Sequence, residues 1–145
     1  MVQPLDGIKV LEMTVAIQGP AAGLFLAEMG ADVIKVEPPI GDSNRYHRGN
    51  DYDVPEDALG SQFIAMNRGK RSLPIDVHHP LGHKAIQNLL AGTDVFLSNY
   101  REDALLRMGL DYESVHASHP QLVYATVNGF GLEGPDANKA MLDGV

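Results

Sequence analysis

Short apolar runs rich in β-branched residues alternate with helical patterns along this chain, and that alternation restricts its fold more than any other feature. Each run is typical of a strand covered on both faces of a parallel sheet. The runs cover residues 8–13, 33–37, 95–99 and 122–127, with a weaker candidate at 72–76 that Pro74 interrupts. Strand–helix–strand repeats with right-handed crossovers predict an α/β fold, a Rossmann-like open parallel sheet with flanking helices.

Helical patterns lie between these runs. Pro20 stands in the first turn of a predicted helix at residues 20–29, and Gly30 follows its end. Because that segment is apolar nearly all round, we expect it to be buried. The segment 38–60 is long, polar and rich in Asp and Gly, and loops of this length are usually functional or disordered. Three further helices are predicted at residues 80–90, 102–108 and 111–117, the last with Asp111 as a possible N-cap.

Composition argues against several classes of protein. The 145 residues suffice for one domain, and the lack of cysteine excludes a disulfide framework, a thiolate metal site and a cysteine nucleophile. A net charge of −8 disfavours nucleic acid and anionic membranes as partners. No apolar run is long enough to span a bilayer, residues 1–9 lack a secretory pattern, and a cytoplasmic location fits. His79 and His83 have helical i, i+4 spacing, but no HExxH pattern includes them, and we expect no metal.

Polar groups collect where the predicted strands end, at the edge where open parallel sheets bind ligands. A turn with Gln18 feeds a helix N-terminus that could face an anion, although it could equally be a plain turn. Asn99, Tyr100 and Arg101 follow another strand. These residues alone predict a Rossmann-like domain that binds a phosphorylated ligand.

Several charged residues leave alternatives open. Arg68, Lys70 and Arg71 could bind phosphate or form a solvated basic turn. Arg107 could bind phosphate or interact with the C-terminal dipole of its short helix. Asp143 could be a catalytic acid or a cap or turn residue.

Six stretches in order give the chain a family resemblance. It resembles the class III CoA-transferases, the CaiB/BaiF group that includes formyl-CoA transferase and the carnitine and bile-acid CoA-transferases, over its whole length. The stretches are residues 4–11, 30–39, 67–72, 91–100, 128–131 and 134–135.

The resemblance implies a place for this chain within a larger fold. Residues 1–145 would be the amino-terminal part of the Rossmann-like, CoA-binding large domain. The small domain and the segment with the nucleophilic aspartate would lie outside it, and two chains would interlock as a dimer. Coenzyme A or acyl-CoA would be the substrate, with no metal. The positions carried over to CoA contacts are Ile17, Gln18, Ile75, Asp76, Val77, His78, Asn99, Tyr100, Arg101, Arg107 and Lys139.

The chemistry implied by the resemblance is CoA transfer from an acyl-CoA to a carboxylic acid, through aspartyl anhydride and enzyme–CoA thioester intermediates. Asp143 matches an assisting acid rather than the nucleophile, so we expect a complementary chain or segment to be needed for activity. Leu142 stands where related racemases have a catalytic histidine, which disfavours an acyl-CoA racemase. A non-catalytic CoA-binding partner module is the other alternative.

Overall fold

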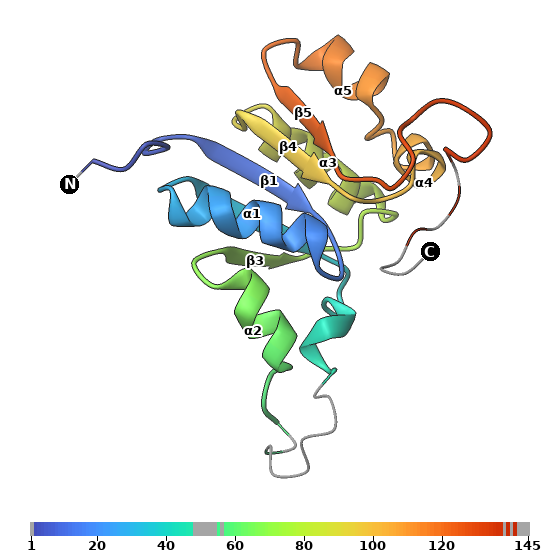
Figure 1. The fold of residues 1–145 in the computed structure, drawn as a ribbon. Helices are drawn as coiled ribbons and strands as arrows, with labels where there is room; N and C mark the ends of the chain where they lie inside the picture. Colours follow the sequence, from blue (N-terminus) through green and yellow to red (C-terminus); the bar gives the residue numbers. More distant parts are fainter. Residues whose placement is uncertain (1, 48–54, 56, 138, 140, 142–145) are drawn as a thin grey trace.

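The computed structural model describes residues 2–47, 55, 57–137, 139 and 141, and its centre is a five-stranded parallel sheet (Figure 1). The strand order is β3-β2-β1-β4-β5, so the chain builds outward from β1 on one side and then on the other. This order places a topological switch point between β1 and β4, where ligands bind in such sheets. The strands are β1 (Lys9–Met13), β2 (Asp32–Glu37), β3 (Arg71–Pro74), β4 (Val95–Ser98) and β5 (Val123–Thr126).

Helices cover both faces of the sheet (Figure 1). On one face, α1 packs its Ala22, Leu26 and Ala27 onto a core cluster that includes Val10 and Leu97. On the other face, α3, α4 and α5 contribute to a larger cluster around Leu11 and Phe96. Neighbouring residues of one strand thus supply different cores, as the two-residue period of a strand requires. The helices are α1 (Gln18–Glu28), α2 (Ser61–Asn67), α3 (Pro80–Leu90), α4 (Glu102–Arg107), α5 (Tyr112–Ser118) and the 3₁₀ helix η1 (Ser43–Arg45).

The predicted fold class is confirmed, and the predicted element ends agree closely with the structure. The predicted and observed ranges of α3 coincide. Asp111 caps α5, since its carboxylate accepts a hydrogen bond from the Ser114 N–H (3.1 Å). Gly30 follows α1 in a left-handed conformation with φ of +104°, which a glycine adopts at little cost.

One helix was not predicted, and one expectation about another helix was wrong. The helix α2 was not predicted, because Phe63 is its only fully buried residue and so leaves no apolar periodicity. The prediction that α1 is buried all round also fails, since Phe25 and Met29 are 60% and 47% exposed. One side of α1 faces the sheet, and its fully buried residues are Gly19, Pro20, Gly23 and Leu24.

None of the helices in the described part of the chain has both the length and the apolar character needed to cross a membrane.

Candidate functional site

The turn between β1 and α1 has an unusual backbone conformation. Ala16 has φ of +64° and is the only residue other than glycine with positive φ among the described residues. The left-handed region is unfavourable for a residue with a side chain, and such conformations persist where surrounding contacts hold them. Gly19 allows this turn to pack closely, since a Cβ there would lie 2.7 Å from the Thr14 Cβ and 2.9 Å from the Asn99 Cγ.

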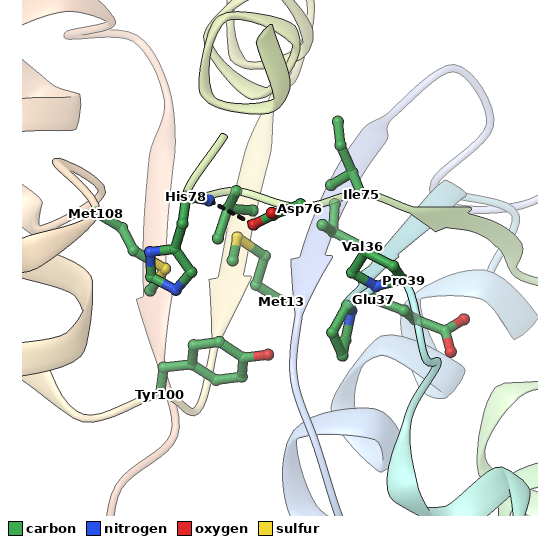
Figure 2. Close-up of a pocket in the computed structure, with 11 residues that line it drawn as sticks. Met13, Val36, Glu37, Pro39, Ile75, Asp76, His78, Tyr100 and Met108 are labelled. Carbon is green, nitrogen blue, oxygen red and sulfur yellow. Dashed lines mark hydrogen bonds between the residues drawn. The ribbon is translucent and has the colours of Figure 1, made fainter. Parts of the chain in front are cut away.

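A cavity of about 130 Å³ lies at the carboxyl ends of the first three strands (Figure 2). We call it the smaller cavity. In Figure 2 the side chains of His78, Tyr100 and Met108 stand on one side of it and those of Pro39 and Ile75 on the other. Its walls are mainly apolar. The lining residues are Met13, Val36, Glu37, Pro38, Pro39, Ile75, Asp76, Val77, His78, Tyr100 and Met108.

A second cavity, of about 380 Å³, lies beside the β1–α1 turn and the ends of β4 and β5. We call it the larger cavity. Tyr100 lines both cavities, so they adjoin along the strand-end edge. One carboxylate oxygen of Glu102 is buried without a hydrogen-bond partner. The lining residues are Val15, Ala16, Gln18, Asn99, Tyr100, Arg101, Glu102, Thr126, Val127, Asn128, Gly129, Leu132, Ala137, Lys139 and Met141.

The structure brings most of the predicted site residues to these two cavities. Ile75, Asp76, Val77 and His78 line the smaller one, Gln18, Asn99, Arg101 and Lys139 line the larger one, and Tyr100 lines both.

The remaining predicted site residues do not line either cavity. Ile17 is the N-cap residue of α1 and is 37% exposed. Arg107 is exposed and donates a hydrogen bond to the Asp103 carboxylate on its own helix (2.8 Å), one position before the cavity residue Met108. Asp143 and Leu142 lie outside the described residues.

The three cations of the predicted basic cluster form ion pairs within the fold. Arg68 forms an ion pair with Glu28, and Arg71 with Asp32 (2.7 Å). The Lys70 side chain is only 1% exposed, and its ammonium nitrogen lies 2.8 Å from the Glu12 carboxylate. Each of the three cations therefore neutralises a carboxylate of this chain, which argues against the phosphate-binding alternative for this cluster.

A buried ionic network lies behind the strand ends. Glu12 and Lys35 are register partners on β1 and β2, and both side chains are at most 1% exposed. The Lys35 ammonium lies 3.1 Å from the Asp42 carboxylate, and the Lys70 ammonium also donates to the carbonyl oxygen of Pro20 (2.8 Å). Burial lowers the pKa of Lys70, although the neighbouring Glu12 carboxylate opposes that shift. The network connects β1 and β2 to α1 and to the segment after β2.

Glu37 connects this network to the smaller cavity. Its carboxylate accepts two hydrogen bonds from Arg45 (2.6 and 2.7 Å), one from the Ser72 hydroxyl (2.8 Å) and one from the Asp42 N–H (2.9 Å). Burial raises the pKa of Glu37, but the hydrogen bonds from Arg45, Asp42 and Ser72 lower it more, to about 2 from 4.5. The guanidinium carbon of Arg45 in turn lies 4.0 Å from the ring centre of Phe63, the buried residue of α2.

The depressed pKa predicts a loss of stability in acid. The contribution of the Glu37 carboxylate is complete above pH 4.5 and disappears as the pH falls towards 2. We expect about 2 kcal/mol of the unfolding free energy to be lost from this group by pH 3. Urea unfolding at pH 7 and pH 3 measures it. Glu37→Gln should be less stable at pH 7 and should lose less on acidification; an equal loss in both proteins would contradict this assignment.

Several residues of the site escaped sequence reasoning. Glu12 and Lys35 stand inside apolar strands, and a charge within such a run was the available signal. Asn44 and Glu102 carry no comparable signal in the sequence. Only the fold brings Asn44 to the β1–α1 turn and Glu102 to the larger cavity. Among the described residues, no group of three or more His, Cys, Asp or Glu side chains is placed to hold a metal ion.

Comparison with known proteins connects the whole chain to one family. The model of CoA-transferase family III matches residues 5–145. The chain is 41% identical to a succinate–glutarate CoA-transferase of Agrobacterium fabrum, over 97% of this chain and 36% of that protein. It is 37% identical to the human succinyl-CoA:glutarate CoA-transferase, over 99% of this chain and 32% of that protein. The chain thus spans about a third of the length of these relatives.

Solved structures agree with the sequence comparison. The crystal structure of a CAIB/BAIF family protein from Brucella suis superposes with a TM-score of 0.88 at 42% identity. The match covers 97% of this chain and 37% of that one. The sheet and its flanking helices therefore correspond to about a third of that larger structure.

Proposed function

The chain belongs to CoA-transferase family III, and from that membership we propose that its two adjoining cavities bind coenzyme A for CoA transfer from an acyl-CoA donor to a carboxylic acid acceptor. The observation that carries the proposal is that Tyr100 lines both cavities, which places them side by side at the strand-end edge. CoA is a long molecule with a flat base at one end and a flexible thiol arm at the other. An edge with a small apolar cavity and a larger cavity that also carries amide and cationic side chains suits such a ligand.

The smaller cavity is suited to the adenine end. Pro39, Ile75 and Met108 offer apolar surface for a flat ring, and the Tyr100 side chain adds an aromatic wall (Figure 2). Arg107 directly precedes Met108 of this cavity, and its ion pair with Asp103 is exposed, so the guanidinium can exchange that partner for a phosphate of the ligand.

The larger cavity is suited to the pantetheine arm and the thioester. Asn99 and Asn128 carry amide groups, and Arg101 and Lys139 carry positive charge. Amide and hydroxyl groups of the arm need such partners when they leave water. The β1–α1 turn would lie beside the reacting carbonyl, where backbone N–H groups can stabilise an oxyanion.

The proposed reaction follows the family's chemistry. A carboxylate attacks the donor thioester, forms a mixed anhydride and releases CoA thiolate. The thiolate then attacks the enzyme carbonyl, which gives an enzyme–CoA thioester and frees the donor acid. The acceptor carboxylate attacks that thioester, forms a second anhydride and again releases CoA thiolate. The thiolate then attacks the acceptor carbonyl, which gives the new acyl-CoA and regenerates the enzyme carboxylate. We assign the nucleophilic aspartate to a segment other than these 145 residues, with Asp143 as an assisting acid.

Trapping the anhydride or thioester tests this chemistry. The protein, together with the chain or segment that supplies the aspartate, is incubated with succinyl-CoA and then with hydroxylamine. We expect a hydroxamate on one aspartate, detected by mass spectrometry of the peptides. CoA binding without any adduct would reject transfer and favour the non-catalytic binding module instead.

Loss of Arg107 should weaken CoA binding. The variant Arg107→Ala removes a charged hydrogen-bond donor, so the affinity for CoA should fall by about 1–3 kcal/mol. Titration calorimetry with CoA measures this. Arg68→Ala is the matched control, since Arg68 is also an exposed arginine in an ion pair, but neither it nor its two chain neighbours line a CoA cavity. An unchanged affinity in Arg107→Ala would remove Arg107 from the site.

A further inference from the structure

We propose that Asn44, which lines neither CoA cavity, is a positioning residue that holds the β1–α1 turn in its binding conformation. The proposal rests on the CoA site proposed above. Its starting point is the left-handed conformation of Ala16, which lies in the wall of the larger cavity. A residue with a side chain leaves this conformation unless its neighbours restrain it.

Three consecutive carbonyl groups of the turn are restrained by three different segments. The Lys35 ammonium donates to the carbonyl oxygen of Thr14 (2.7 Å). The Asn99 side-chain amide donates to the carbonyl oxygen of Val15 (2.8 Å) and accepts from the N–H of the same residue (2.9 Å). The Asn44 side-chain amide donates to the carbonyl oxygen of Ala16 (2.9 Å). The left-handed residue is thus the one that Asn44 holds.

The backbone of Asn44 is itself held by the buried ionic network. Its backbone N–H donates to the Asp42 carboxylate (2.9 Å), and Asp42 is buried and paired with Lys35. Lys35 is also the residue that holds Thr14. The 3₁₀ helix η1 and the β1–α1 turn are therefore connected twice, directly by Asn44 and indirectly through Asp42 and Lys35. The ionic network holds the backbone of Asn44 in place.

Of the three restraints, Asn44 allows the cleanest test of positioning. Lys35 is buried in the core, so its loss would disturb folding. Asn99 lines the larger cavity, so its loss would also remove a ligand contact. Asn44 is half-buried and lines neither CoA cavity, so an effect of its substitution on CoA affinity must pass through the turn.

The experiment measures the Kd for CoA by titration calorimetry, in the full protein, for a small set of variants. Asn44→Ala should raise the Kd about three- to tenfold, as for one lost hydrogen bond. Asn44→Asp should raise it at least as much, because a carboxylate cannot donate and repels the Ala16 carbonyl oxygen. Ser43→Ala is the matched control and should leave the Kd unchanged, since Ser43 is its exposed neighbour in η1.

A rescue variant separates positioning from general damage. Glycine adopts the left-handed conformation without steric cost, so Ala16→Gly should restore most of the affinity lost in Asn44→Ala. Equal Kd values for wild type and Asn44→Ala would overturn the proposal. Weakened binding in Asn44→Ala that Ala16→Gly does not restore would overturn it as well, because the loss would then not arise at Ala16. If the wild type does not bind CoA, the proposed function fails, and this positioning role fails with it.

Discussion

Replacing Glu12 by alanine should lower the free energy of unfolding by about 3–5 kcal/mol, because it leaves two buried lysines without their shared carboxylate. The ammonium group of Lys70 would keep the Pro20 carbonyl and the Asn67 side chain as partners but would lose its counter-charge. Lys35 would keep the Thr14 carbonyl and the Asp42 carboxylate as partners but would lose one of its two carboxylates. A buried cation without enough negative charge is far more costly than a missing hydrogen bond. Urea unfolding at pH 7, monitored by circular dichroism, measures this loss.

The matched control is Asp32→Ala, which removes a carboxylate from the neighbouring strand β2. Asp32 pairs with Arg71, but both side chains are about half exposed or more. An exposed ion pair contributes about 0–1 kcal/mol, so this variant should be close to wild type in stability. Similar losses in the two variants would mean that burial of the Glu12 network does not determine its contribution.

Replacing Gly82 by alanine should destabilise the protein by about 3 kcal/mol, although alanine normally favours a helix over glycine. A Cβ at this position of α3 would overlap the carbonyl oxygen of Asp76 and lie 2.9 Å from its carbonyl carbon. That carbonyl cannot move freely, because it accepts a hydrogen bond from the His79 N–H (3.2 Å). A displaced Asp76 would change the wall of the smaller cavity, which it lines. The affinity for CoA should therefore fall together with the unfolding midpoint.

Gly92→Ala provides the matched comparison after the other end of α3. The nearest atom to a Cβ there is the Leu89 carbonyl oxygen at 3.8 Å, which is ordinary contact. This variant should be neutral or stabilised by about 0.4–1 kcal/mol. Thermal unfolding and CoA titration of both variants test the contrast. A Gly82→Ala protein as stable as Gly92→Ala would show that the β3–α3 connection can shift without cost.

The sheet could be predicted because its signal is local. The strands are short runs of apolar, often β-branched residues, and strand–helix alternation leaves few topologies for them. The helix α2 could not be predicted, since its position depends on Phe63 meeting Arg45 across the segment after β2. The exposure of Phe25 could not be predicted either, because an apolar pattern all round a helix does not tell which side packs on the sheet.

The candidate site was predictable in part for the same reason. Residues that follow strands, such as Asn99 and Tyr100, meet at one edge in any parallel sheet. The partners of Lys70 could not be foreseen, because Glu12 lies on a strand that precedes it by 58 residues and is separated from it by β2 in the sheet order. A basic run in the sequence therefore suggested a phosphate site where the fold holds a buried ion pair. Asn44 was missed because its role depends on the conformation of Ala16.

The central position of β1 sets the order in which the molecule can be completed during synthesis. Once residue 74 has left the ribosome, β1, β2 and β3 can pair, and the buried charges around Lys35 can come together. Asn99 emerges later, and only then can the Val15 carbonyl accept a hydrogen bond from that side chain and the Val15 N–H donate one to it. Contacts so distant in sequence form slowly, because a long loop must close first. The nascent chain would therefore hold a half-sheet with an open central strand, and the β1–α1 turn would reach its final shape only after β4 has joined the sheet.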